Sequence, residues 1–256
     1  MNEGVLKRLS LPQNADKLGR KFNMIFHSLY NDWGSCLVRY KEFWELFGDS
    51  DRVKLLNAIG SGLFWDVQQL SWSDLMLRLT RLTDPPTSGT KDNLTVTRLP
   101  HLCEDRYLRD EVCGLVDKAV RAAEFARDWR NRRISHSDLE LAIDPSAKPL
   151  ATADLTKVKA TLDAVHAVLN TISVRLLDAG IHNDVVVTPR ARAFAAYLKQ
   201  LADSVQYIDS VIDPSGNLPV TDLAPATTFL QRLDRRPTWQ HQRAVVELRE
   251  AARRFK

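Results

Sequence analysis

The sequence of 256 residues has little of what marks a membrane or secreted protein. No stretch approaches the roughly 18 to 20 consecutive apolar residues that a bilayer-spanning helix needs. Residues Met1 to Leu11 have neither a long apolar run nor a small-residue cleavage site, so we do not expect a secretory signal. The three cysteines, Cys36, Cys103 and Cys113, show no Cys-x-x-Cys spacing, which favours buried free thiols in a reducing compartment. We therefore expect a cytoplasmic protein with no membrane partner.

Several common catalytic signatures are also missing. The sequence has no Gly-x-x-x-x-Gly-Lys, no Gly-x-Gly-x-x-Gly and no nucleophile-elbow pattern. His101, Cys103 and Cys113 match no familiar zinc spacing and are too few to hold an ion. We therefore expect neither a cofactor nor a metal site. The net charge of +4 and the pI of about 9.0 give only mild support for a polyanionic partner.

Most of the chain has helical periodicity, which predicts an all-α fold. Apolar positions three and four apart predict long helices over residues 14–47, 53–82, 104–134 and 155–176. Weaker helices follow at 190–212, 222–234 and 239–255, and 185–188 is the best strand candidate. The sequence therefore predicts a helical bundle over residues 1–182 and a C-terminal helical extension over residues 183–256.

Several residues predict where these helices begin and end. An N-cap is expected within Gly48–Asp51, and Pro85 is expected to end the second helix. Thr152 is the expected cap of the fourth helix, which is expected to stop near Gly180. The fourth helix carries an unbroken heptad seam, which packs either into a bundle or into a dimer: Leu155, Val158, Leu162, Val165, Leu169, Ile172 and Leu176.

Four aromatic residues lie on otherwise apolar helical stripes in the first two helices. They are Phe43, Trp44, Trp65 and Trp72. We expect them to belong to the core rather than to stack on nucleic acid bases.

One segment, residues 127–136, concentrates the polar chemistry at the end of a long helix. Its sequence is Arg-Asp-Trp-Arg-Asn-Arg-Arg-Ile-Ser-His. Arg132 and His136 share a face if the helix persists, whereas Arg130 and His136 do not on a straight helix. Arg130 and His136 could therefore cooperate across a kinked helix end, or across a twofold axis between two subunits.

These residue types suit cleavage of RNA. A histidine can accept the proton of a 2′-hydroxyl near neutral pH, and an arginine has planar paired donors for the phosphoryl oxygens. Asn131 can orient either group through a hydrogen bond. A basic helix end that only complements the helix dipole would have much the same composition, so composition leaves this alternative open.

The motif Arg130, Asn131, four residues and His136 resembles the active-site motif of HEPN ribonucleases. A second segment, residues 73–84, resembles a Leu-Arg-Leu-x-Arg-Leu-x-Asp helix of the AbiU-like branch, which is linked to phage abortive infection. His136-Ser137-Asp138 also matches the His-x-Asp continuation of that branch. The resemblance covers about residues 20–180.

The resemblance implies a HEPN-like bundle that acts as a metal-independent endoribonuclease, so an enzyme is our leading interpretation. It implies catalytic roles for Arg130 and His136, with Asn131 assisting. It also implies a homodimer with a composite cleft, RNA as the substrate and a role as a toxin or antiphage defence effector. A neutralising partner protein is a further expectation. Supporting polar residues are expected to be Arg81, Asp84, Asp128, Arg132, Arg133 and Asp138.

Three alternatives and one departure from the family pattern accompany this interpretation. Arg81 and Asp84 could pair only with each other, since they are three residues apart. Some HEPN toxins carry a tyrosine two residues after the histidine that a partner modifies, and Asp138 stands there instead. The second function hypothesis is a non-catalytic HEPN-type module that binds RNA or protein. The basic tail, residues 229–256, could grip RNA or form the solvated face of a docking helix.

Overall fold

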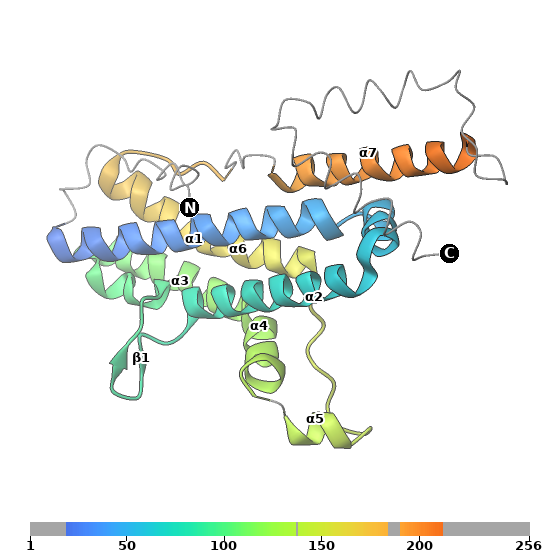
Figure 1. Cartoon of the computed structure of the whole chain (residues 1–256). Coiled ribbons are helices and arrows are strands. Elements are labelled where there is room, and N and C mark those ends of the chain that lie inside the picture. The colour runs from blue at the N-terminus through green and yellow to red at the C-terminus, as the bar shows by residue number, and fades with distance from the viewer. Residues whose placement is uncertain (1–18, 137, 184–189, 212–256) are drawn as a thin grey trace. The chain divides into compact units, whose positions relative to one another are not determined.

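The computed structural model describes residues 19–136, 138–183 and 190–211, and most of these residues are helical, as the sequence predicts (Figure 1). The α-helices are α1 Arg20–Phe47, α2 Ser50–Thr83, α3 Arg106–Ala122, α4 Glu124–Trp129, α5 Leu139–Ile143, α6 Leu155–Leu177 and α7 Arg190–Val211. The other helical elements are the 3-10 turns η2 Val96–Arg98 and η3 Pro100–Leu102 and the π-turn η4 Arg130–Ile134. Strands β1 Thr87–Ser88 and β2 Lys91–Asp92 pair antiparallel, and the sequence did not predict them.

The chain divides into two compact units, Met1–Ala196 and Tyr197–Lys256. The bundle described below belongs to the first unit. The strand candidate at 185–188, the helices expected at 222–234 and 239–255, and the basic tail at 229–256 lie outside the described residues. The expected domain boundary after residue 182 stays a prediction.

Helix α2 begins and ends as its sequence predicts. Asp49 is the N-cap, and its Oδ1 accepts hydrogen bonds from the backbone N–H groups of Asp51 and Arg52 at 3.1 and 3.0 Å. The helix bends at Gly60, whose backbone leaves the helical region, and ends at Thr83 ahead of Pro85. None of the described helices has an apolar stretch long enough to cross a bilayer.

Helix α6 is the centre of the core, because it packs on both α1 and α3. Most of its heptad seam is buried against other helices of the same chain, so the seam packs into a bundle and not into a dimer interface. From α1, the indole Nε1 of Trp33 donates to the Leu162 carbonyl at 3.0 Å. The expected cap Thr152 is wrong: Asp154 directly precedes the helix, and its carboxylate accepts from the N–H of Lys157 at 2.8 Å.

The core assignment of the aromatic residues is correct for only some of them. Phe43 is buried, and Trp72 is half-buried with its ring centre 5.4 Å from that of Phe43. Trp65 is 59% exposed and Trp44 is 44% exposed, with the Arg52 guanidinium over the Trp44 ring. Periodicity identifies the apolar face of a helix but not how far along it a neighbouring helix packs.

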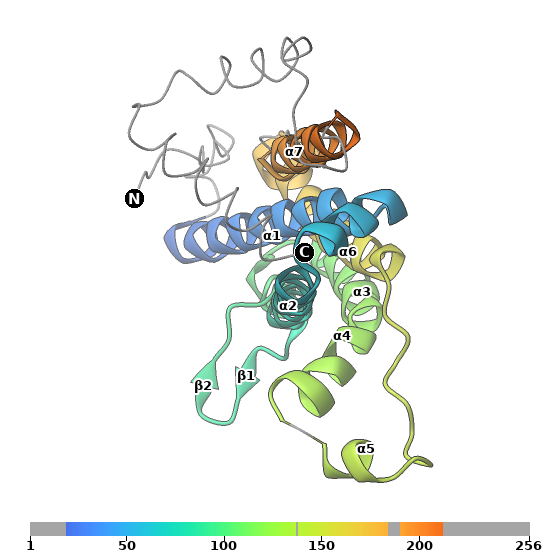
Figure 2. The same cartoon turned by 45° about the vertical axis from the view of Figure 1, so that its right-hand side comes forward.

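The long helix expected over residues 104–134 is interrupted, and this break orients the candidate site. Helix α3 ends at Ala122, whose carbonyl accepts the Thr161 hydroxyl of α6 at 2.8 Å. Ala123 leaves the helical region, and α4 starts at Glu124. Helices α4 and α5 therefore project away from α1 and α6 (Figures 1 and 2).

Candidate active site at the end of α4

The end of α2 forms one side of the site, and hydrogen bonds from two threonine hydroxyls hold it in place. The backbone carbonyl of Asp84 accepts hydrogen bonds from the hydroxyls of Thr95 at 2.7 Å and Thr97 at 3.0 Å. Thr95 is fully buried, and its hydroxyl also donates to the Leu82 carbonyl at 3.0 Å. These contacts explain why a Thr-x-Thr segment follows the hairpin: it satisfies carbonyls that a helix end leaves without intrahelical partners.

Arg127 of α4 joins this helix end to the motif. Its Nη2 donates to the Thr83 carbonyl at 3.1 Å, and its Nε lies 3.8 Å from Oδ1 of Asp84. We did not single out Arg127 from the sequence. Its position three residues before Arg130, on the same face of a helix, is the signal that could have identified it.

Arg130 makes the shortest ion pair of the site. Its Nη1 lies 2.6 Å from Oδ2 of Asp84, and its Nε donates to the Asn131 side-chain oxygen at 3.0 Å. The two charged side chains are 26% and 17% exposed. Within the described part of the chain, Nη2 of Arg130 has no hydrogen-bond partner, so its two N–H groups are available to an anion.

The alternative in which Arg81 and Asp84 pair only with each other is wrong, because Asp84 pairs with Arg130. Asp84 follows the last helical residue with extended backbone angles of −64° and 160°, which take its side chain off the face that Arg81 occupies. Arg81 is exposed and makes no hydrogen bond or ion pair with any residue that the structure describes. Asp84 pairs instead with an arginine 46 residues away in the sequence.

The motif itself lies on a π-turn rather than on a continuous α-helix. The N–H of Ser135 donates to the Arg130 carbonyl five residues earlier, at 2.8 Å. This wider turn ends at Ile134, so the helical face that Arg132 and His136 would share does not exist. π-turns of this kind occur often at functional sites.

His136 follows the π-turn and is exposed to solvent. Across residues 19–136, 138–183 and 190–211, no side chain forms a hydrogen bond or ion pair with it, so its imidazole is accessible. The structure therefore links Arg130 to Asp84 and Asn131 but shows no direct contact between Arg130 and His136.

Arg132 belongs to a second cluster. Its Nε donates to Oδ2 of Asp138 at 2.8 Å, its Nη2 donates to the Lys148 carbonyl at 2.7 Å, and its Nη1 lies 3.7 Å from Asp128. The hydrogen bond with Arg132 lowers the pKa of Asp138, and the N–H of Leu141 at the start of α5 adds to this effect. The same pair raises the pKa of Arg132.

Two further residues attach this cluster to the core. Oδ2 of Asp128 accepts the Ala151 N–H at 2.7 Å, and the Trp129 indole donates to the Ala151 carbonyl at 2.8 Å. Trp129 packs edge-on against Trp72. Arg133 is exposed, with its guanidinium 5.7 Å from the centre of the Trp129 ring. Of the expected supporting residues, Asp84 thus belongs to the Arg130 cluster, and Asp128 and Asp138 belong to the Arg132 cluster. Arg81 and Arg133 form no described ion pair with either cluster.

The cysteines and the possible metal ligands lie outside both clusters. Cys36 and Cys103 are buried as expected, but Cys113 is exposed, and all three are free thiols. Burial raises the pKa of the Cys36 thiol to about 12. Among the described residues, no three His, Cys, Asp or Glu side chains gather as metal ligands would.

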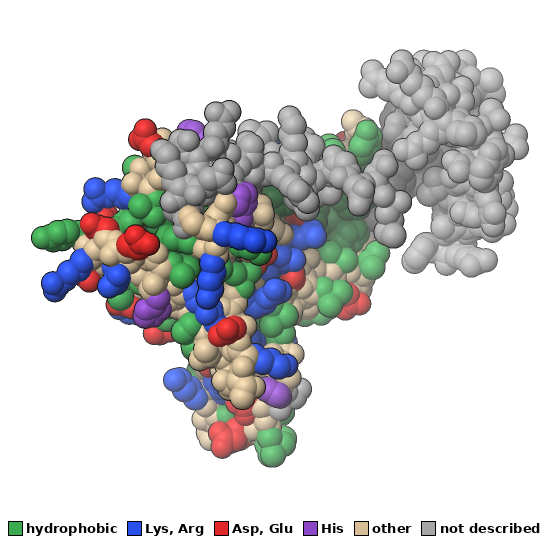
Figure 3. All heavy atoms as spheres, turned by 90° about the vertical axis from the view of Figure 1, so that its left-hand side faces the viewer, with side chains coloured by type: hydrophobic (Ala, Val, Ile, Leu, Met, Phe, Trp, Pro, Cys, Tyr) green, Lys and Arg blue, Asp and Glu red, His purple; other side chains and the backbone are tan. Residues whose placement is uncertain are grey.

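Lys and Arg side chains gather in the middle of the face seen in Figure 3.

Comparison with known protein families gives a match over most of the chain. The model of the family described as AbiU2, a HEPN family, matches residues 19–208. The match begins where the resemblance was expected to begin and ends at residue 208 rather than near 180, so it includes most of α7. No curated protein and no solved structure matches the chain.

Proposed function

The chain belongs to the AbiU2 family of HEPN proteins, and on that premise we propose that it is an endoribonuclease whose catalytic residues are Arg130 and His136. One observation carries the proposal. Arg130 is held on two sides by Asp84 and Asn131 while two of its donors stay available, and an accessible His136 follows the same π-turn.

The reaction uses the 2′-hydroxyl of RNA as its nucleophile. The imidazole of His136 accepts the 2′-hydroxyl proton, the 2′-oxygen bonds to the neighbouring phosphorus, and the bond to the 5′-oxygen breaks. The leaving 5′-oxygen takes a proton from a protonated imidazole. The products are a 2′,3′-cyclic phosphate and a 5′-hydroxyl. A metal ion is not needed for this balance, and DNA is not a substrate because it lacks the 2′-hydroxyl.

Arg130 stabilises the charge that develops on the phosphoryl oxygens. The ion pair with Asp84 fixes the plane of the guanidinium, and preorganised donors are more effective than donors that must be ordered during the reaction. The free Nη2 then faces the substrate. Asn131 restrains the same guanidinium through its side-chain oxygen.

Within one chain the described contacts of Arg130 are with Asp84 and Asn131 and not with His136, so a second copy of the chain can bring the two catalytic residues together. We therefore propose a homodimer in which Arg130 of one chain serves His136 of the other across one basic cleft. Mixing Arg130→Ala with His136→Ala protein tests this arrangement. Shared sites restore about a quarter of the wild-type activity, because half of the randomly formed dimers hold one intact site. If each chain holds a whole site, mixing restores nothing.

The cleavage assay tests the function itself. RNA is incubated in EDTA with wild-type protein, with His136→Ala and with the control His101→Ala, which changes another exposed histidine. We expect cleavage by the wild type and the control but not by His136→Ala. Equal cleavage by all three proteins would contradict the catalytic assignment.

The biological role that fits this activity is that of a toxin or antiphage defence effector restrained by a partner protein. Expression of the wild type is expected to arrest growth, and expression of His136→Ala is not. Arrest by both proteins would point away from RNA cleavage.

One observation favours a second candidate function, a non-catalytic RNA-binding module. The charge of Arg130 is already paired with Asp84, whereas the exposed Arg81 is not paired within the described residues. This candidate predicts salt-sensitive RNA binding that survives His136→Ala, with no cleavage by either protein.

A further inference from the structure

The segment after the motif leaves the bundle and returns to it. We name residues 135–150 the α5 arm, because they include helix α5 and the loops on either side of it. Figures 1 and 2 both show α5 lying away from α1 and α6. His136 is the second residue of the α5 arm, so whatever holds the base of the α5 arm also places His136.

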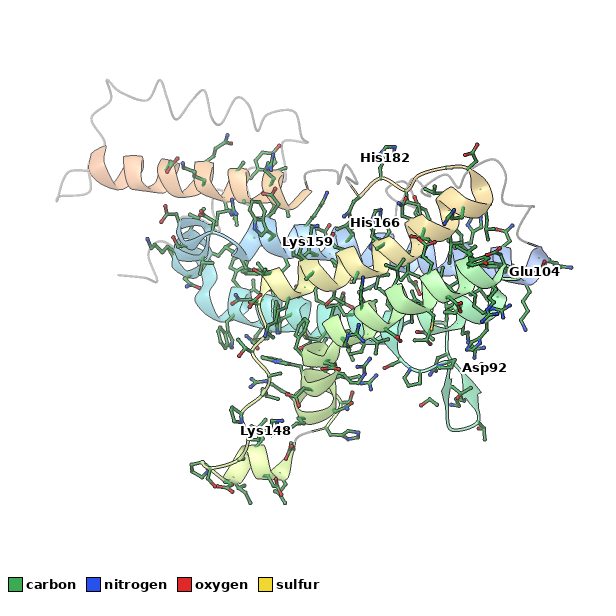
Figure 4. The ribbon with its side chains drawn as sticks, turned by 180° about the vertical axis from the view of Figure 1, so that it is seen from behind. Asp92, Glu104, Lys148, Lys159, His166 and His182 are labelled. Atoms are coloured by element: carbon green, nitrogen blue, oxygen red, sulfur yellow. The ribbon has the colours of Figure 1, made fainter. Side chains whose placement is uncertain are left out.

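Arg132 holds both ends of the α5 arm at once. Near the start, its Nε donates to Asp138 at 2.8 Å. Near the end, its Nη2 donates to the carbonyl of Lys148 at 2.7 Å, and its Nη1 donates to the carbonyl of Pro149 at 3.4 Å. Lys148 is labelled in Figure 4, in the segment beside α5. One guanidinium therefore closes the α5 arm into a loop.

Each nitrogen of the Arg132 guanidinium makes one hydrogen bond within the chain. In addition, Nη1 lies 3.7 Å from the carboxylate of Asp128. The Arg132 side chain is only 19% exposed. The adjacent Arg133 is exposed and rests over the Trp129 ring. Two neighbouring residues of equal charge thus have different surroundings, and Arg133 is the more exposed of the two.

Two backbone hydrogen bonds hold Ser135 and Asp138, the described residues nearest to His136 on either side. The N–H of Ser135 donates to the Arg130 carbonyl at 2.8 Å, and the N–H of Asp138 donates to the Arg132 carbonyl at 3.1 Å. The ion pair between the side chains of Arg132 and Asp138 adds a second link between the same two residues. His136 has no such contact of its own among the described residues, so its position depends on these neighbours.

We propose that Arg132 is a positioning residue, which places the His136 imidazole by gripping Asp138 and the far end of the α5 arm rather than by binding RNA. The proposal rests on the function proposed above. A displacement of about 1 Å in a reacting group lowers a rate by up to about 100-fold. Loss of the Arg132 contacts with the α5 arm should therefore lower kcat, whereas loss of a phosphate contact should raise KM.

Arg132→Gln and Arg133→Gln form a matched pair, because each removes one positive charge from adjacent positions. We expect Arg132→Gln to lower kcat by about 10- to 100-fold with KM nearly unchanged. Arg133→Gln is the control for lost charge, and we expect it to lower kcat less than Arg132→Gln does, since the described contact of Arg133 is with the Trp129 ring and not with the α5 arm. Arg132→Lys restores the positive charge but not the three hydrogen bonds, so we expect its kcat to stay low. A raised KM with an unchanged kcat in Arg132→Gln, or full activity of Arg132→Lys, overturns the proposal.

A readout without RNA separates this proposal from the proposed function. The imidazole carbon–proton signal of His136 is recorded by NMR in the wild type and in Arg132→Gln. We expect the signal to shift or broaden in the variant and to stay unchanged in Arg133→Gln. An unchanged His136 signal in Arg132→Gln overturns the positioning role, while absence of RNA cleavage by the wild type overturns only the function. If Arg132→Gln does not fold, Asp138→Asn removes the same ion pair and is measured in its place.

Discussion

Replacing Asp84 by alanine tests how the end of α2 supports the motif. The change removes the carboxylate that lies 2.6 Å from Arg130 and 3.8 Å from Arg127. It leaves two arginine side chains close together without their counter-charge. Because Asp84 and Arg130 are 17% and 26% exposed, solvent compensates only part of the loss.

The expected cost follows from these contacts. A hydrogen bond to a charged group contributes about 1.5 to 3 kcal/mol, and the longer contact with Arg127 adds less than about 1 kcal/mol. We therefore expect Asp84→Ala to lower the free energy of unfolding by about 2 kcal/mol. For a chain of this size, that corresponds to a fall in Tm of about 4 to 8 °C. We also expect a lower kcat for RNA cleavage, since Arg130 is no longer held in one orientation.

Asp92→Ala is the matched control for stability. Asp92 pairs with Arg98, but its side chain is 80% exposed on the β-hairpin, where Figure 4 labels it. An exposed pair contributes about 0 to 1 kcal/mol, so the control should change Tm little. Thermal unfolding followed by circular dichroism measures both variants. If Asp84→Ala costs no more than Asp92→Ala, the argument from burial and short distance is refuted.

Three further predictions concern the surroundings of the site. Thr95→Val removes a buried hydroxyl that donates to two carbonyls at the end of α2, so unfolding in urea should show a loss of about 1 to 3 kcal/mol, and a wild-type midpoint would contradict this. Alkylation of the native protein should modify the exposed Cys113 but not the buried Cys36, whose raised pKa keeps the thiol protonated, and mass spectrometry of the peptides would reveal the opposite pattern. The pKa of Asp138 lies below its unfolded value of about 3.9, so its pair with Arg132 stabilises the fold above that pH and is lost as the pH falls through the folded pKa. The Nε proton signal of Arg132 should therefore persist in mildly acidic solution and disappear only below about pH 4, and its loss near pH 6 would refute this assignment.

Much of the bundle could be predicted because its causes are local. The cap at Asp49, the stop before Pro85 and the apolar seam of α6 depend on residues within a few positions of one another. The exposure of Trp65 could not be predicted in the same way. It depends on where a neighbouring helix ends, which the sequence of α2 does not contain.

The candidate site shows the same division. The segment itself predicts either a kinked helix end or a site shared between two subunits, since Arg130 and His136 fit poorly on a straight helix, and the π-turn shows the first of these. The partner of Asp84 could not, because Arg81 is nearer in sequence but Arg130 is nearer in space. That choice depends on the extended backbone at Asp84 and on how α2 packs against α4.

The chemistry of the RNA ends tests the central claim most directly. A short RNA, and the same RNA with 2′-deoxy substitutions throughout, are incubated in EDTA with wild-type protein or with His136→Ala. The account predicts fragments ending in a 2′,3′-cyclic phosphate only from the RNA and only with the wild type. Cleavage of the deoxy substrate, or equal cleavage of RNA by His136→Ala, would contradict it.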